Sequence, residues 1–160
     1  HCTPRNPDCT SCPLTKVCIA RKQNLQAMLP VKIAAAPKKE RYFNYLLLEK
    51  DGKIWMKKRD AGDIWHGLYD FLLIESDKRL NDKMLKLQMI RQFNLTGAPR
   101  LIQTLTHILT HQKLHTSFFH INHPFEVSEN KKLSGKFFSR NEIKKLPKPV
   151  FIDKILNLLN

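Results

Sequence analysis

The chain has 160 residues, 42% of them hydrophobic, and its 28 Lys and Arg against 14 Asp and Glu give a formal net charge of +14. This length predicts one ordinary domain, or one domain with an appendage, and the apolar content is enough for a hydrophobic core. No apolar run approaches the roughly 20 residues of a membrane span, and no signal peptide is visible, so we expect a cytosolic protein without membrane association. Because the sequence begins at His1, we expect it to be a piece of a longer protein.

The basic excess is typical of proteins that bind nucleic acid, because Lys and Arg that neutralise phosphates release counterions. A Lys-rich surface that serves solubility alone stays open as an alternative.

All four cysteines lie in one short stretch, CTPRNPDCTSCPLTKVC, as Cys2, Cys9, Cys12 and Cys18. Zinc sites usually present two tight cysteine pairs, whereas this spacing contains one. Three prolines disfavour helix and strand here, and an irregular loop of this kind can wrap an iron–sulfur cluster. From the spacing, a cluster, a zinc site and disulfides all remain open, although a reducing cytosol favours metal ligands.

Behind the cysteines the sequence predicts a short helix over 19–29 and a linker over 30–41, which is rich in proline, small residues and cations. Alternating and β-branched patterns then predict strands. These are a hairpin turning at Asp51-Gly52 and four further segments: 42–50, 53–59, 68–76, 99–110, 113–122 and 135–139.

Helices are predicted at three places in this second part of the chain. A central segment places apolar residues at helical spacing, which is typical of a face that packs on a core: Leu80, Met84, Leu87, Ile90 and Phe93. The sequence SRNE at 139–142 predicts a capping box that opens a short helix, and 150–159 predicts a terminal amphipathic helix. Strands, a helix, more strands and closing helices define an α+β domain.

Several of these segments resemble a known family. The cysteine stretch resembles the iron–sulfur loop that closes the helix-hairpin-helix domain of endonuclease III-type and MutY-type DNA glycosylases. KKRDAGDIWHGLYDF (57–71), THQKLHTSFFHI (110–121) and LPKPVFIDKIL (146–156) resemble the C-terminal domain of MutY-type adenine DNA glycosylases, which has a Nudix-like fold. The motifs occur in the family's order and cover essentially the whole chain.

The resemblance implies a domain organisation. Residues 1–20 would form the iron–sulfur loop that ends a helix-hairpin-helix domain missing here. Residues 21–40 would be the linker, and 41–160 the Nudix-like domain, a mixed β-sheet with flanking helices. It also implies a 4Fe-4S cluster on the four cysteines in the parent protein, which we expect the isolated fragment to load weakly or not at all. In this family the loop between the first two cysteines approaches DNA phosphate, and Arg5 is its only cation here.

The resemblance further implies a role in base-excision DNA repair. The family's catalytic Glu and Asp would lie upstream of His1, so we expect the parent to be an adenine DNA glycosylase and this fragment to be inactive alone. The C-terminal domain would recognise 8-oxoguanine opposite adenine, so that only mispaired adenine is removed. The implied partners are double-stranded DNA with 8-oxoguanine:A or G:A mispairs and the N-terminal catalytic domain, in a monomer of the bacterial cytosol and nucleoid.

The family reads the lesion with an aromatic-Ser-His turn, and the matching positions are Leu109, Thr110 and His111. Thr keeps a hydroxyl that both donates and accepts, which suits the hydrogen on N7 of 8-oxoguanine. Leu109 can fill an apolar space, but it cannot stack on a base as an aromatic ring can.

A working Nudix hydrolase needs the motif G-x5-E-x7-R-E-x2-E-E, whose carboxylates hold magnesium. Counted from Gly67, the first required Glu position is Leu73, and residues 83–93 contain no carboxylate. Pyrophosphatase activity is therefore not expected.

Other side chains admit both functional and structural interpretations. His107, His111 and His115 recur every four residues, but without Cys or carboxylate among them a polar strand face or DNA-facing loop is favoured over a metal site. Trp55 and Trp65 could stack on bases, although the family pattern places Trp65 in the core. The lysines at 131, 132 and 136 predict diffuse attraction to phosphate. The alternative to a repair protein is a non-enzymatic regulator with a zinc module that binds nucleic acid or protein.

Overall fold

The computed structural model describes residues 1–3, 5–29, 31, 37–122 and 133–159, which form two compact units, His1–Pro37 and Lys38–Asn160. Lys131 and Lys132, for which we expect diffuse attraction to phosphate, lie outside the described residues. The helices are α1 (Ile19–Lys22), α2 (Asp82–Phe93), α3 (Arg140–Lys145) and α4 (Val150–Asn157). The strands are β1 (Lys39–Lys50), β2 (Lys53–Lys58), β3 (Tyr69–Asp70), β4 (Leu72–Ser76), β5 (Arg100–Ile108), β6 (Gln112–Asn122) and β7 (Lys136–Ser139). No described helix is long and apolar enough to cross a membrane.

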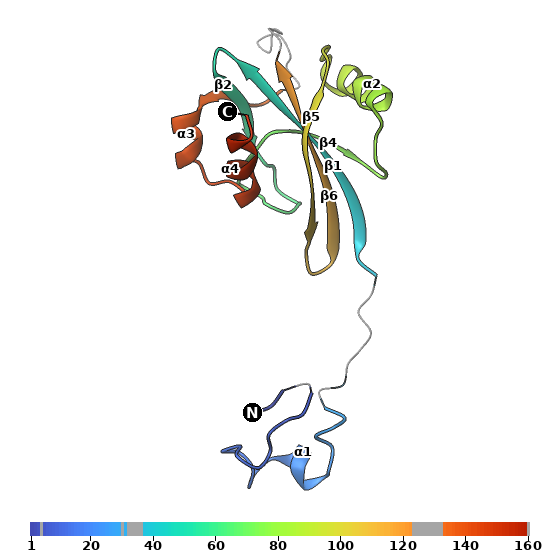
Figure 1. Cartoon of the computed structure of the whole chain (residues 1–160), viewed down its shortest axis with the longest axis vertical. Coiled ribbons are helices and arrows are strands. Elements are labelled where there is room, and N and C mark those ends of the chain that lie inside the picture. The colour runs from blue at the N-terminus through green and yellow to red at the C-terminus, as the bar shows by residue number, and fades with distance from the viewer. Residues whose placement is uncertain (4, 30, 32–36, 123–132, 160) are drawn as a thin grey trace. The chain divides into compact units, whose positions relative to one another are not determined.

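A mixed sheet with β1 at its centre forms the second unit (Figure 1). On one side β1 runs parallel to β6 over its whole length, from Lys39↔Gln112 to Glu49↔Asn122. On the other side it pairs antiparallel with β4 and then, past residue 48, with β2. β5 continues the sheet beyond β6, and β7 pairs with β2. The predicted hairpin is confirmed, because Asp51 and Gly52 both take the positive φ, 51° and 70°, that a tight hairpin turn requires.

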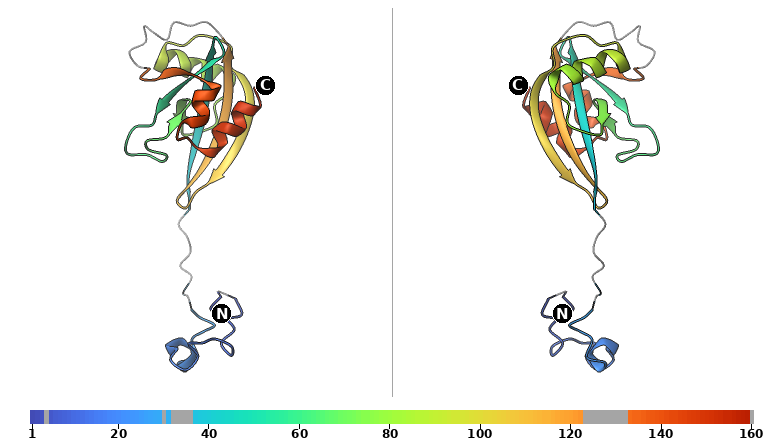
Figure 2. Two further views of the ribbon diagram at one scale, coloured as in Figure 1. Left: turned by 90° about the vertical axis from the view of Figure 1, so that its left-hand side faces the viewer. Right: turned by 90° about the vertical axis from the view of Figure 1, so that its right-hand side faces the viewer.

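The two faces of this sheet carry separate cores. Odd-numbered β1 residues such as Phe43 and Tyr45 pack with α4 and α3 on one face. Even-numbered residues such as Leu46 and Leu48 pack with α2 on the other face. The side views in Figure 2 show α2 on one face of the sheet and α3 and α4 on the opposite face. The period of two along the strand therefore serves two hydrophobic clusters at once.

The helices follow their predicted caps. The capping box of α3 is confirmed, with Ser139 and Glu142 each accepting a hydrogen bond from the other's backbone N–H. The Asn81 side chain accepts from the N–H of Met84 at the start of α2, and Asn94 ends that helix with φ 51°. Both ends of α2 therefore satisfy backbone groups that a helix leaves unpaired.

The predicted core face of α2 is wrong. Leu85 and Met89 are buried, whereas Met84, Leu87 and Ile90 are 38%, 55% and 48% exposed. The apolar residues of α2 form two overlapping stripes. The sheet packs against the stripe that contains Leu85 and Met89, which are four residues apart. Leu80 and Phe93 are partly buried in the same cluster, as expected.

Candidate cysteine site and nucleic-acid interface

The cysteine stretch folds around a hollow in the first unit. All four cysteines are free thiols, and together they line a cavity of about 420 Å³. Cys2 is exposed, and the other three are partly buried. The structure therefore favours a ligand site over the disulfides that spacing alone left open.

Hydrogen bonds shape this loop in place of regular structure. The Asp8 carboxylate accepts from the backbone N–H of Ser11 at 3.2 Å and from the hydroxyls of Thr10 and Ser11. These bonds lower the pKa of Asp8. Thr15 donates to the carbonyl oxygen of Cys9, as does Arg21. The segments that carry Cys9, Cys12 and Cys18 are thus tied to one another.

Zinc and an iron–sulfur cluster need different arrangements of the thiols. One zinc ion with four sulfur ligands at about 2.3 Å draws those sulfurs to within roughly 4 Å of each other. A cluster is a larger body whose irons each take a separate thiolate. The cavity that the four cysteines line is compatible with both. Arg5 is exposed in this loop.

The turn that joins β5 to β6 holds the expected lesion-reading residues. Thr110 and His111 are exposed, whereas Leu109 is partly buried against the core on the α4 side. The backbone is fixed at both ends: Lys38 Nζ donates to the Leu109 carbonyl at 2.6 Å, and the Lys39 N–H donates to the His111 carbonyl at 3.1 Å. The turn is therefore anchored through its backbone and exposes two polar side chains to solvent.

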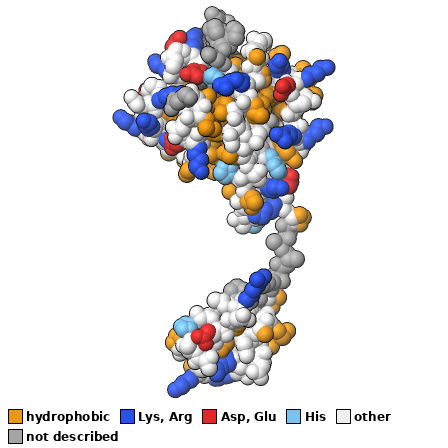
Figure 3. Space-filling model, in the orientation of Figure 1, with side chains coloured by type: hydrophobic (Ala, Val, Ile, Leu, Met, Phe, Trp, Pro, Cys, Tyr) orange, Lys and Arg blue, Asp and Glu red, His pale blue; other side chains and the backbone are white. Residues whose placement is uncertain are grey.

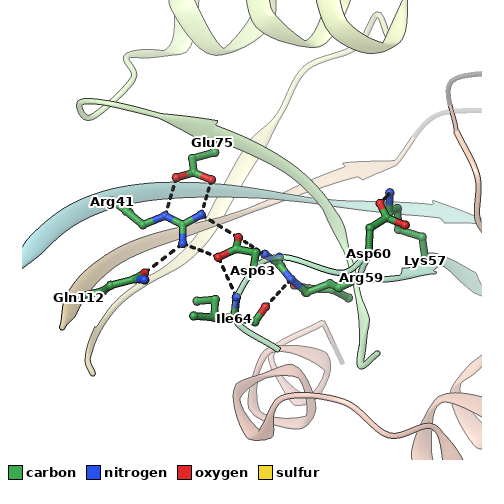
Figure 4. Close-up of polar contacts among 9 residues, drawn as sticks. Arg41, Lys57, Arg59, Asp60, Asp63, Ile64, Glu75 and Gln112 are labelled. Carbon is green, nitrogen blue, oxygen red and sulfur yellow. Dashed lines mark hydrogen bonds and ion pairs between the residues drawn. The ribbon is translucent and has the colours of Figure 1, made fainter. Parts of the chain in front are cut away.

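Next to this turn lies a group of charges that the sequence analysis missed (Figure 4). Arg41 Nη1 and Nη2 donate to Asp63 at 2.7 and 2.8 Å, and Nε and Nη2 donate to Glu75 at 2.6 Å. Arg41 Nη1 also reaches Gln112 Oε1 at 3.0 Å. The Arg41 guanidinium lowers the pKa of Asp63 to about 2. The carboxylates of Asp63 and Glu75 in turn raise the pKa of Arg41. Arg41 thus joins β1, β4, β6 and the loop before β3.

A second arginine extends this network into the sheet. Arg59 donates to Asp63 at 2.9 Å and to Asp70 at 3.1 Å. Asp70 is 1% exposed, and burial raises its pKa to about 6 despite the neighbouring cation. Arg59, Asp63 and Asp70 all lie in the segment 57–71 that resembles the family, but the segment does not show that they pair with one another or with Arg41.

A polar groove of about 380 Å³ opens on the α2 side of the sheet, beside the turn. His115 stacks on Tyr42 with ring centroids 4.7 Å apart, and its Nε2 lies 3.0 Å from Glu40. Among the described residues, no partner is found for the exposed guanidinium of Arg79 in the groove wall. The remaining wall includes the hydroxyl-bearing residues Thr104, Thr106 and Ser117. Arginine and hydroxyl groups are the side chains that commonly contact phosphates.

The three recurring histidines do not lie on one side. His107 points into the core on the α4 side, with its ring 6.1 Å from Trp65 and 5.5 Å from Phe151. His115, across the turn, faces the groove on the opposite side, because the turn shifts the strand parity. Trp55 is fully buried and Trp65 packs on the core, so both tryptophans serve packing rather than base stacking.

The region that a Nudix hydrolase would use for magnesium has a different composition here. Within α2 the only acidic residue is Asp82, in its first turn. Nearby carboxylates are engaged by cations: Asp60 with Lys57 at 2.9 Å, Asp63 with Arg41 and Asp70 with Arg59. These carboxylates therefore form ion pairs within the fold, where a Nudix hydrolase would use carboxylates to hold magnesium.

Comparison with known families defines the class of this protein. Residues 2–18 match the iron–sulfur binding domain of endonuclease III, and residues 44–158 match the NUDIX domain. Since the second match covers more than half of the chain, the chain belongs to the NUDIX domain family. The expected α+β fold, with a mixed sheet and flanking helices, is confirmed.

Comparison with curated proteins is more specific. The adenine DNA glycosylase of Buchnera aphidicola subsp. Schizaphis graminum is 25% identical over 158 residues, which are 98% of this chain and 44% of that protein. The adenine DNA glycosylase of Buchnera aphidicola subsp. Acyrthosiphon pisum is 29% identical over 70 residues, 44% of this chain and 20% of that protein. The chain spans less than half the length of either relative. The resemblance to MutY-type enzymes inferred from the motifs is confirmed.

Solved structures agree on the fold. The C-terminal domain of mouse MUTYH, solved in complex with human PCNA, superposes with a TM-score of 0.58 at 12% identity, covering 74% of this chain and 86% of that one. A MutT protein from Methanosarcina mazei gives 0.61 at 14% identity, covering 77% and 95%. The E. coli ORF135 protein gives 0.56 at 15% identity, covering 78% and 93%. At such identities the likeness is one of fold.

Proposed function

We propose that this chain is the C-terminal part of an adenine DNA glycosylase and that its sheet domain recognises 8-oxoguanine opposite adenine. Residues 1–20 would carry the iron–sulfur loop, 21–40 the linker, and 41–160 the recognition domain. The N-terminal catalytic domain of the same chain would flip and excise the adenine. The substrate would be duplex DNA with 8-oxoguanine:A or G:A mispairs, bound by a monomer in the bacterial cytosol.

The observation that carries the proposal is the exposed, backbone-anchored turn at Leu109–His111, at positions where the family reads the lesion. Leu109 packs inward, which agrees with a turn that works through hydrogen bonds rather than stacking. The groove beside it offers Arg79 and hydroxyl-bearing side chains for phosphates. Figure 3 shows Lys and Arg side chains outnumbering Asp and Glu on the domain face that it presents. Base reading and phosphate attraction are thus assigned to neighbouring surfaces.

The test is Thr110→Ala with His111→Ala in the full-length protein. Loss of one good base contact costs about 1–3 kcal/mol, so the preference for 8-oxoguanine:A over G:A duplexes should fall by roughly five- to 150-fold. Affinity for undamaged duplex should stay within about threefold, because that affinity comes mainly from Lys and Arg. Fluorescence anisotropy with the three duplexes measures both quantities.

Arg79→Ala is the matched control. It should weaken all three duplexes alike and reduce the slope of log affinity against log salt by about 0.9, the value for one phosphate contact. If the double variant keeps its full lesion preference, or loses the three duplexes equally, the turn is not the reader.

For the cysteine loop we propose a 4Fe-4S cluster held by Cys2, Cys9, Cys12 and Cys18. When bound, the cluster would supply a rigid centre for the loop, in the way that structural metals contribute folding free energy. Stoichiometric zinc without iron in the full-length protein would instead support the alternative, a zinc-containing regulator.

We also propose that the fragment alone has neither glycosylase nor pyrophosphatase activity. The family's catalytic pair lies outside it, and residues 83–93 supply no carboxylate for magnesium. Magnesium-dependent release of pyrophosphate from an oxidised nucleotide, above a heat-denatured control, would contradict this.

A further inference from the structure

Arg21 links α1 to the middle of the cysteine loop. It belongs to α1, which starts directly after Cys18, and its Nη1 donates to the carbonyl oxygen of Cys9 at 2.5 Å and to Thr15 Oγ1 at 2.8 Å. The Thr15 hydroxyl donates to the same carbonyl. Arg21 therefore connects the segments that carry Cys9 and Cys18.

The charge of Arg21 has no carboxylate partner among the described residues. Its side chain lines the same cavity as the four thiols. The other ionisable groups beside the cysteines are Asp8, whose carboxylate is already engaged by Ser11 and Thr10, and His1, whose Nδ1 lies 3.2 Å from the Ser11 hydroxyl. An unpaired, half-buried guanidinium next to four thiols is suited to an anionic occupant.

Gln26 adds an independent observation on the same cavity. It lines the wall, and its Oε1 is buried with no hydrogen-bond partner in the described part of the chain. A buried, unsatisfied polar atom costs about 1–3 kcal/mol, so an occupant that satisfies the amide is favoured. A half-turn of the amide exchanges Oε1 and Nε2 and presents two N–H donors. Thiolate and sulfide sulfurs accept such hydrogen bonds.

We propose that Arg21 and Gln26 are positioning residues for the iron–sulfur cluster, and that they make its reduced state easier to reach; this rests on the cluster assigned above. A cluster with four thiolates is an anion, and an added electron makes it more negative. A nearby cation and N–H donors stabilise the more negative state, so they raise the reduction potential. The Arg21 bridge also slows the separation of Cys9 from Cys18 when iron is withdrawn.

The experiment compares Arg21→Gln with Lys22→Gln in the full-length protein. Lys22 is the exposed neighbour in α1, so both variants lose one charge but only the first loses a cavity group. We expect Arg21→Gln to lose iron to a chelator about three- to tenfold faster. A three- to tenfold weaker preference for the reduced state lowers the potential of a one-electron couple by about 30–60 mV. Lys22→Gln should match the wild type in both.

Three further variants separate charge from hydrogen bonding. Arg21→Lys should restore most of the potential but not the iron retention, because an ammonium lacks the planar fork of donors. If Arg21→Gln purifies without iron, the reduction potential of Arg21→Lys can still be measured. Gln26→Leu should lower the potential with little change in retention. Asp8→Asn removes a negative charge from the wall and should shift the potential upward.

Two results would overturn the inference. If iron-loaded Arg21→Gln keeps the wild-type potential and retention, or if Lys22→Gln shifts both equally, Arg21 has no specific role, while the proposed cluster stands. A wild-type protein that purifies without iron would overturn the cluster as well.

Discussion

In the sheet domain Phe43, Tyr45 and Trp55 are completely buried, whereas in the described part of His1–Pro37 no apolar side chain is buried, and Leu14, Val17 and Ile19 are 63%, 67% and 69% exposed. The domain has the apolar surface to hold its own fold. The cysteine loop lacks such an apolar surface. A chain shorter than roughly 40 residues usually needs metals, disulfides or a partner surface to fold. Two units in one chain thus obtain their stability from different sources.

The largest effect should follow from removal of iron from the full-length protein. Structural metals contribute about 10–16 kcal/mol of apparent binding free energy, so the loop should lose its fold entirely. Trypsin would then cut at Lys16, Arg21 or Lys22, while the sheet domain stays intact. Mass spectrometry of the digest, with the iron-loaded protein as control, measures this. Cuts inside the sheet domain at the same rate would refute the independence of the two units.

Phe118→Ala should produce the reverse pattern. Phe118 is fully buried, with its ring stacked on Tyr45 at 5.1 Å and tilted against Phe151 at 5.4 Å. Its loss should cost about 3–5 kcal/mol of unfolding free energy. In the 160-residue chain both tryptophans lie in the sheet domain, so urea unfolding of this chain, followed by tryptophan fluorescence, reports on that unit alone. Ile108→Ala, at a site 68% exposed, should change little, and both variants should leave the iron retention of the full-length protein unaffected.

Asp63→Asn should cause a smaller, pH-dependent loss. Arg41 lowers the pKa of Asp63 from 3.8 to about 2, so its stabilisation is present above about pH 4 and disappears as the pH falls through about 2. Because the side chain is 34% exposed and screened, we expect about 1–2 kcal/mol at pH 7. The difference between wild type and variant is measured by urea unfolding from pH 7 to 2, and it includes any change at Asp70, because Asp63 and Asp70 share Arg59. A difference that persists at pH 2 would contradict this account.

His107→Phe should have the smallest effect, and it should be stabilising. The His107 Nε2 is buried without a hydrogen-bond partner in the described chain, between Trp65 and Phe151. An apolar ring of similar size removes that cost, and we expect a gain of about 0.5–1 kcal/mol. His111→Phe, in the exposed turn, is the control and should be neutral. A loss of stability in the first variant would show that Nε2 has a partner.

The sequence predicted the elements of the sheet domain well, because turns and caps are local. Asp51-Gly52 and the box at Ser139 depend on neighbours within three residues. The face of α2 could not be predicted, since apolar residues occupy two stripes and only the position of the sheet decides between Leu85 and Met84. Local pattern thus determines an element's existence better than its orientation.

The candidate sites divide in the same way. The cysteines and the turn were found from motifs. The Arg41 network was missed because its partners, Asp63 and Glu75, come from segments that only the tertiary fold brings together. Arg21 was missed because a single cation after the last cysteine has no pattern until its contact with Cys9 is seen.

The parallel pairing of β1 with β6 has a consequence for synthesis. Glu40 and Lys113, neighbours across these strands, are 73 residues apart in the chain, and the last register pair is Glu49↔Asn122. On the ribosome the cysteine loop emerges early, whereas β1 waits until most of the chain has been made. Long-range pairings of this kind are slow to form. Until β6 arrives, only elements made before it, such as β2, β4 and α2, can cover the apolar run Leu46–Leu48. The nascent chain is therefore most exposed to aggregation between the translation of β4 and that of β6.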